Sequence, residues 1–167
     1  MKIPIRIRSR AALFAAVALL ALAFASAAFA SLGGDASTVE QDSVQMKSTK
    51  RTAAQPSAKY TVQEMQTEAG TTVKEYVSPQ GTVFAVTWRG PFMPDLEQLF
   101  GSYYDQYQQA TTQRRQAQAQ GGIRQRGPIR IQQPGLVVES GGHMRGYVGK
   151  AYLPDMLPAG VQPGDIQ

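Results

Sequence analysis

The sequence has no cysteine, one histidine and one tryptophan among its 167 residues. Without cysteine there are no disulfides, no thiolate nucleophile and no lipoprotein anchor. A Ser-His-Asp triad or a zinc site would depend on His143. Ser140 and His143 flank a Gly-Gly turn without a nucleophile elbow, and no two acidic residues stand at ligand spacing from His143. The sequence therefore favours no catalytic residue, no metal and no cofactor.

Long apolar runs are rare as well, and the clearest one follows the N-terminus. Met1–Arg10 carries four basic residues, Ala11–Phe24 is uncharged and apolar, and Ala28-Phe29-Ala30 places small residues where a signal peptidase reads. We predict a signal peptide over residues 1–30, cleaved near Ala30/Ser31, and hence a periplasmic or secreted protein. The alternative is an uncleaved anchor, because residues 11–30 approach the ~20 apolar residues of a membrane-spanning helix.

The chain also has very little net charge once the leader is set aside. The net charge of the whole chain is +5, and four basic residues but no acidic residue lie before position 31, so the remainder carries +1. The basic character thus belongs largely to the leader, and it gives no argument for binding nucleic acid.

What is present is a meander of three strand-like runs, rich in β-branched and aromatic residues. They are Tyr60–Thr67, Thr71–Val77 and Thr82–Arg89. Glu68-Ala69-Gly70 and Pro79-Gln80-Gly81 fit three-residue hairpin loops with a left-handed glycine. This register sets Val62 opposite Tyr76, Glu64 opposite Lys74, and Tyr76 opposite Phe84.

The register predicts two unequal faces of the sheet. One is aromatic, and its members are Tyr60, Val62, Tyr76, Phe84, Val86 and Trp88. The other is thinner and holds Met65, Val73, Val77, Val83 and Ala85. A helix begins at Pro94-Asp95 and carries one apolar stripe, formed by Leu96, Leu99, Phe100, Tyr103, Tyr104 and Tyr107. We expect this stripe to cover the aromatic face.

The remaining segments are read from composition. Residues 31–46 resemble a short helix, and 47–59 lack periodicity and predict a flexible tether. Residues 108–134 form a low-complexity linker rich in Gln and Arg, with the helix running into its first part until Gly121-Gly122. Residues 135–167 predict a hairpin that turns at Gly141-Gly142, followed by a Pro-rich tail. The fold class is α+β: one antiparallel sheet of about five strands, covered on one face by an amphipathic helix.

Two groups of residues are candidate binding sites. At the hairpin, main-chain amides, an imidazole and a guanidinium converge, which suits a small anion or carboxylate, through Ser140, Gly141, Gly142, His143 and Arg145. In the linker, a cationic arm could contact anionic lipid, through Arg114, Arg115, Arg124, Arg126 and Arg130. A solvated linker is the simpler interpretation of the second group.

Two further patterns have structural alternatives. Tyr103, Tyr104 and Tyr107 could stack on sugars, but their helical spacing is typical of core residues. Glu64 and Glu75 could form the carboxylate pair of a glycosidase, yet the predicted register points them to opposite faces.

Six short motifs stand out along the chain: Ser31-Leu32-Gly33-Gly34, Glu75-Tyr76-Val77-Ser78-Pro79, Phe84-Ala85-Val86, Trp88-Arg89-Gly90-Pro91, Met93-Pro94-Asp95-Leu96 and Ser140-Gly141-Gly142-His143-Met144-Arg145. Together they resemble a family of small exported proteins of Gram-negative bacteria, DUF2844, which is defined as a domain of unknown function. The resemblance implies export and supplies neither an activity nor catalytic residues.

The sequence therefore predicts a non-enzymatic periplasmic module that binds a protein or an envelope component through a sheet edge or the 140–145 turn. Two alternatives stay open: a small envelope enzyme centred on His143 and Arg145, and a protein held on anionic lipid by its arginines.

Overall fold

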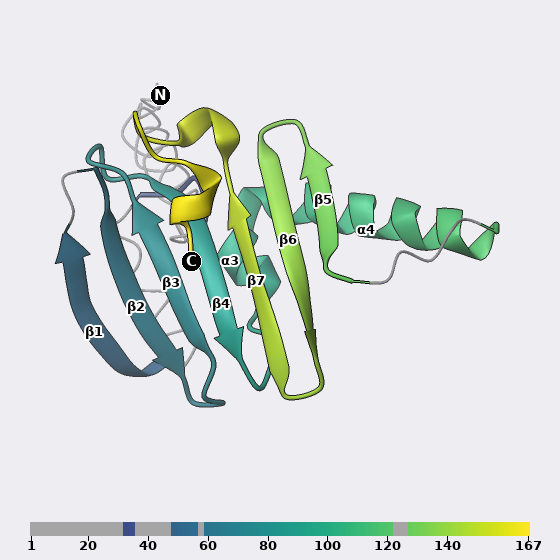
Figure 1. Cartoon of the computed structure of the whole chain (residues 1–167), viewed down its shortest axis with the longest axis horizontal. Helices are drawn as coiled ribbons and strands as arrows, with labels where there is room; N and C mark the ends of the chain where they lie inside the picture. The colour runs from purple at the N-terminus through teal and green to yellow at the C-terminus, as the bar shows by residue number, and fades with distance from the viewer. Residues whose placement is uncertain (1–31, 36–47, 57–58, 122–126) are drawn as a thin grey trace, which may run out of the picture.

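The computed structural model describes residues 32–35, 48–56, 59–121 and 127–167, the second of these ranges by its backbone alone. Seven strands form one antiparallel sheet in the order β1-β2-β3-β4-β7-β6-β5 (Figure 1). The strands are β1 (Ser48–Pro56), β2 (Thr61–Thr67), β3 (Thr72–Val77), β4 (Val83–Gly90), β5 (Ile129–Gln133), β6 (Leu136–His143) and β7 (Gly146–Tyr152). The predicted α+β class with a helix on an antiparallel sheet is confirmed, and the sheet is larger than the predicted one.

The two predicted hairpin loops are present. Gly70 and Gly81 have φ of 81° and 85°, a left-handed backbone that glycine adopts without the clash of a Cβ. Thr67 N donates to Thr71 O at 2.9 Å, and Ser78 N donates to Thr82 O at 2.8 Å, which closes both loops. The predicted pairing of β2 with β3 is therefore correct, with Val62 opposite Tyr76 and Glu64 opposite Lys74.

The pairing of β3 with β4 departs from the prediction at one residue. Tyr76 pairs with Ala85 and Val77 with Val83, so Phe84 is an extra residue in a β-bulge, and the predicted pair of Tyr76 with Phe84 is wrong. Because a shift of one residue exchanges the faces of a strand, Val86 and Trp88 turn to the face opposite Phe84.

The helical segment covers the other face from the one predicted. It consists of α3 (Leu96–Phe100), a 3-10 turn η3 (Gly101–Tyr103) and α4 (Tyr104–Ala119). Asp95 caps α3, since its Oδ1 accepts from the backbone N–H of Glu97 at 3.0 Å and of Gln98 at 3.2 Å. The apolar side chains of the helical segment pack with Met65, Val73, Val77, Val83, Val86 and Trp88 in the main core. Because the bulge turns Trp88 toward this face, covering this face buries more apolar surface than covering the opposite face would.

The opposite face, called here the helix-free face, is covered in part by the end of the chain. Residues 153–167 form two short 3-10 turns, η4 (Pro154–Met156) and η5 (Pro163–Asp165). Val161 and Ile166 pack there in a second core. It also contains Tyr76, Phe84, Ala85, Val137 and Tyr152, with Tyr60, Val62 and Leu157 at its border. The Tyr76 hydroxyl donates to Gln167 O, and Lys59 Nζ donates to Gly160 O at 2.7 Å, so the tail is fixed at several points.

Two segments predicted to be irregular contain strands. The predicted tether, 47–59, contains β1, which pairs with β2, and the predicted linker, 108–134, contains most of α4 and then β5. The sequence of β1 has no large apolar residue, whereas β5 contributes Ile131 to the main core.

The leader and nearly all of the predicted 31–46 helix lie outside the described residues, although Leu32 is buried and Asp35 bridges to Thr82. In the part of the chain that the structure describes, no helix has the length and apolarity needed to cross a membrane.

Candidate functional site

The β6–β7 hairpin turns three residues later than predicted. Its tip is Met144-Arg145, and Gly141 and Gly142 are ladder residues opposite Val148 and Tyr147. A Cβ on Gly142 would lie 2.1 Å from the backbone oxygen of Gly146, so glycine at this position allows the two strands of the hairpin to approach closely. The prediction of a turn at Gly141-Gly142 was therefore wrong, because the glycine at 142 is needed for close approach of the strands.

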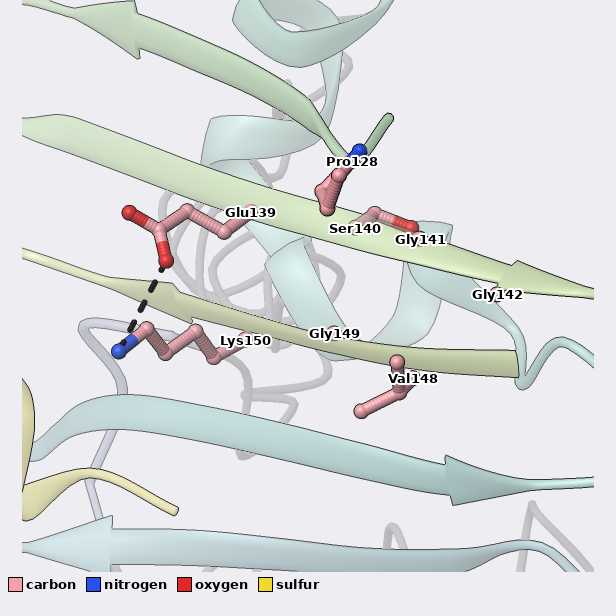
Figure 2. Close-up of a pocket in the computed structure, with 8 residues that line it drawn as sticks. All are labelled: Pro128, Glu139, Ser140, Gly141, Gly142, Val148, Gly149 and Lys150. Atoms are coloured by element: carbon pink, nitrogen blue, oxygen red, sulfur yellow. Dashed lines mark ion pairs between the residues drawn. The ribbon is translucent and has the colours of Figure 1, made fainter. Parts of the chain in front are cut away.

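A shallow pocket of about 240 Å³ lies on the helix-free face, beside the covering tail. Figure 2 shows it from that face, with the helices behind the strands. It is lined by Pro128, Glu139, Ser140, Gly141, Gly142, Val148, Gly149 and Lys150. A Cβ on Gly141 would stand 3.3 Å from Cβ of Pro128. The floor is therefore bare main chain, and it is open because residue 141 has no side chain.

A cluster of three charges closes one end of the pocket. Arg130, Glu139 and Lys150 stand side by side on β5, β6 and β7. Glu139 Oε1 lies 3.3 Å from Arg130 Nη1, and its Oε2 lies 3.8 Å from Lys150 Nζ. Lys150 Nζ also donates to Pro163 O at 2.9 Å, so the same ammonium joins the pocket to the tail.

The charged cluster belongs to a polar row that crosses the helix-free face. Lys150 is paired with Thr87, Thr87 with Lys74, and Lys74 with Glu64, whose Oε2 lies 4.0 Å from Lys74 Nζ. Ion pairs this exposed contribute only about 0–1 kcal/mol to stability. The ion pairs of the row thus add little to the stability of the fold.

The structure divides the predicted hairpin site. Ser140, Gly141 and Gly142 line the pocket, whereas His143 and Arg145 lie beyond it at the exposed tip. His143 Nδ1 is 3.0 Å from Met144 O. Sequence reasoning did not select Glu139 and Lys150, although strand alternation places Glu139 on the same face as Gly141 and opposite Lys150.

The predicted cationic residues lie in regular structure where they are described. Arg114 Nη1 donates to the backbone oxygen of Arg130 at 3.4 Å, which ties α4 to the outer edge of β5. Arg115 is on α4, and Arg130 belongs to the charged cluster. Arg124 and Arg126 lie outside the described residues.

The tyrosines of the helical stripe are core residues. Tyr103, Tyr104 and Tyr107 pack at the border of the main core, and the Tyr107 ring meets Phe100 edge-on at 5.1 Å between centroids. Burial raises the pKa of Tyr107 above its ordinary value of 10, with a smaller upward contribution from Tyr104 and a lowering one from Arg115.

The two carboxylates considered as a catalytic pair do not meet. Glu64 lies on the helix-free face, paired with Lys74, while Glu75 is opposite Val86 and buried beneath the helices. Within the described ranges, no group of three acidic or histidine side chains could hold a metal ion.

Comparisons with known proteins agree with the family suggested by the motifs. A family model described as a protein of unknown function, DUF2844, matches residues 28–166. No curated protein and no solved structure matches the chain.

Proposed function

The chain belongs to the DUF2844 family of proteins of unknown function, and we propose that it is an exported, non-enzymatic module that binds a protein or another component of the cell envelope on the helix-free face. The observation that carries the proposal is the glycine-floored pocket beside the cluster of Arg130, Glu139 and Lys150. A bare main-chain floor allows a partner to approach closely, and the partly exposed charges at its end orient that partner.

The face is a better binding surface than the outer edge of β5. Gln106 Nε2 donates to Pro134 O at 3.0 Å, and Arg114 donates to Arg130 O. These contacts occupy backbone oxygens that an added strand would need. With only five residues, β5 also offers a short template. This favours the face over β5 as the surface that a partner contacts.

Binding is favoured over catalysis by the composition of the pocket. Its lining contains one hydroxyl, Ser140, and its two ionisable groups, Glu139 and Lys150, lie close to one another. His143, at the centre of the enzyme alternative, lies at the exposed hairpin tip. Export is supported by the basic and apolar leader, and by a family match that starts at residue 28, next to the predicted cleavage site near Ala30/Ser31.

Filling the pocket tests the proposal. Gly141→Ala places a methyl group on the floor, and φ at this position is not in the left-handed region, so the backbone accepts the change. Gly164→Ala is the matched control, because its Cβ would meet nothing within 4 Å. The protein is purified as it accumulates in cells, crosslinked to envelope extract, and the captured components are compared.

We expect a discrete component to be captured by the wild type and by Gly164→Ala and to be lost with Gly141→Ala. Thermal unfolding of each variant verifies that the fold persists. Equal capture by both variants would overturn the proposal, as would an enzymatic activity that disappears with His143→Ala.

A further inference from the structure

The pocket is smaller than the sites that enclose metabolites. Its volume of about 240 Å³ is below the range of roughly 300–1,000 Å³ typical of pockets for drug-sized ligands. It is also shallow, lying on the face of a sheet between Pro128 and Val148 (Figure 2). A site of this kind has room for one or two residues of a longer chain lying across the face.

Charge around the pocket is unbalanced. Arg89 is paired with Val148 and lies on the same face as the charged cluster. The charged side chains that β4 to β7 place on this face are therefore three cations, Arg89, Arg130 and Lys150, and one carboxylate, Glu139. Of these, Glu139 and Lys150 line the pocket itself. Positive potential on one side of an interface is complementary to a negatively charged partner.

The carboxylate already present is loosely held. Its distances to Arg130 and Lys150 are 3.3 and 3.8 Å, longer than the roughly 2.7–2.9 Å of a strong charge-assisted hydrogen bond. The Arg130 side chain is 60% exposed, so its guanidinium can turn toward a second carboxylate. Glu139 thus competes with an incoming carboxylate for these two cations.

Building on the proposed function, we infer that the partner is a protein and that it enters the pocket with an acidic segment. A carboxylate of that segment binds Arg130 and Lys150, displacing Glu139, and its neighbouring backbone lies on the floor formed by Gly141 and Gly149. Since Gly141 has no side chain on the floor, and a side chain at position 149 would point to the opposite face toward Trp88, residues that flank the acidic one need not be small for its main chain to make contact.

The test uses two blocked pentapeptides that are identical except for a central Glu or Gln. Each is titrated into the full protein, as it accumulates in cells, while the amide resonances of Gly141 and Gly149 are followed by NMR. We expect the Glu peptide to bind, more weakly as salt is raised, and the Gln peptide to bind at least several-fold more weakly.

Three variants separate the roles of the charges. Glu139→Gln removes the internal competitor and should strengthen binding of the Glu peptide several-fold. Arg130→Gln should weaken it about tenfold, as expected for the loss of one charged hydrogen bond. Lys74→Gln is the matched control, a lysine of the same face that does not line the pocket, and should leave binding within twofold.

Two results of these measurements would contradict the inference. Weaker binding by Glu139→Gln would mean that the ligand is cationic and would overturn the inference. Binding to phosphatidylglycerol vesicles but to neither peptide would assign the pocket to a phosphate headgroup, with the same consequence. Either result leaves the proposed function intact if Gly141→Ala still abolishes capture from envelope extract, so the two failures are distinguishable.

Discussion

Gly149→Ala tests the packing on which both the core and the pocket depend. Gly149 is paired with Trp88, and a Cβ at this position would lie 2.2 Å from Cζ2 of the indole and 2.8 Å from the backbone oxygen of Glu139. Trp88 is 1% exposed, and its ring is 6.0 Å from that of Phe100 between centroids, so it has little room to move. The added methyl group must displace either the ring or β6.

Overpacking of this kind costs about 1–3 kcal/mol, and the closeness of the two contacts places Gly149→Ala at the upper end. Replacing glycine also stabilises by about 0.4–1 kcal/mol, because the unfolded chain loses freedom. We therefore expect a net loss of about 2 kcal/mol, equivalent to a fall in Tm of roughly 5–10 °C for a domain of this size.

Urea unfolding followed by tryptophan fluorescence measures this change directly, because Trp88 is the only tryptophan of the chain. Gly164→Ala serves as the reference, and it should unfold within about 0.5 kcal/mol of the wild type. In the Gly149→Ala background, Trp88→Phe should cost less than it does alone, since the smaller ring relieves the clash. The variants with Trp88→Phe have no tryptophan, so their urea unfolding is followed by circular dichroism. A Gly149→Ala variant as stable as the wild type, or additive effects of the two changes, would show that the expected clash with Trp88 does not occur.

Three further predictions concern other parts of the fold. Because burial raises the pKa of Tyr107, the unfolded chain loses this proton first as the pH rises above 10, so stability falls there; Tyr107→Phe should flatten this decline in pH-dependent urea unfolding, and an unchanged decline would contradict the burial of its hydroxyl. Arg145 has φ of 66°, so Arg145→Gly should raise the free energy of unfolding by about 1 kcal/mol, and an unchanged or lower value in chemical denaturation would contradict the turn geometry. Ile166 is 1% exposed in the second core, so Ile166→Ala should lower thermal stability by about 2–4 kcal/mol, whereas a loose tail would show no change.

The sequence predicted local structure well where a short motif determines it. Glycine at the third loop position fixed both turns of the meander, and the turn then fixed the pairing of β2 with β3. The start of the helix at Asp95 was equally local, because proline and a capping carboxylate suffice. The bulge at Phe84 could not be foreseen, since an extra residue in a strand is selected by packing on both faces. That single residue reversed the prediction of which face the helix covers.

The sequence did not predict the edge strands or the site, because both depend on contacts between strands rather than on local sequence. β1 and β5 pair with the backbone of β2 and β6, which composition does not reveal, so the segments that contain them resembled linkers. At the hairpin, the pair Gly141-Gly142 indicated a turn, but the constraint at Gly142 comes from the backbone of Gly146 across the ladder. Because the tip is at Met144-Arg145, Glu139 is paired with Lys150, and strand alternation then places both side chains in the cluster beside the pocket.

The strand order has a consequence for the way the chain acquires its structure. β7, the last strand in sequence, lies between β4 and β6 and joins the two halves of the sheet. Contacts such as that between Tyr76 and Gln167 span 91 residues, and non-local contacts of this kind slow folding. A chain that ends before β7 presents the unpaired edge of β4 and an uncovered apolar face. Incomplete chains are therefore prone to associate edge to edge, a hazard that ends only when β7 has paired with β4.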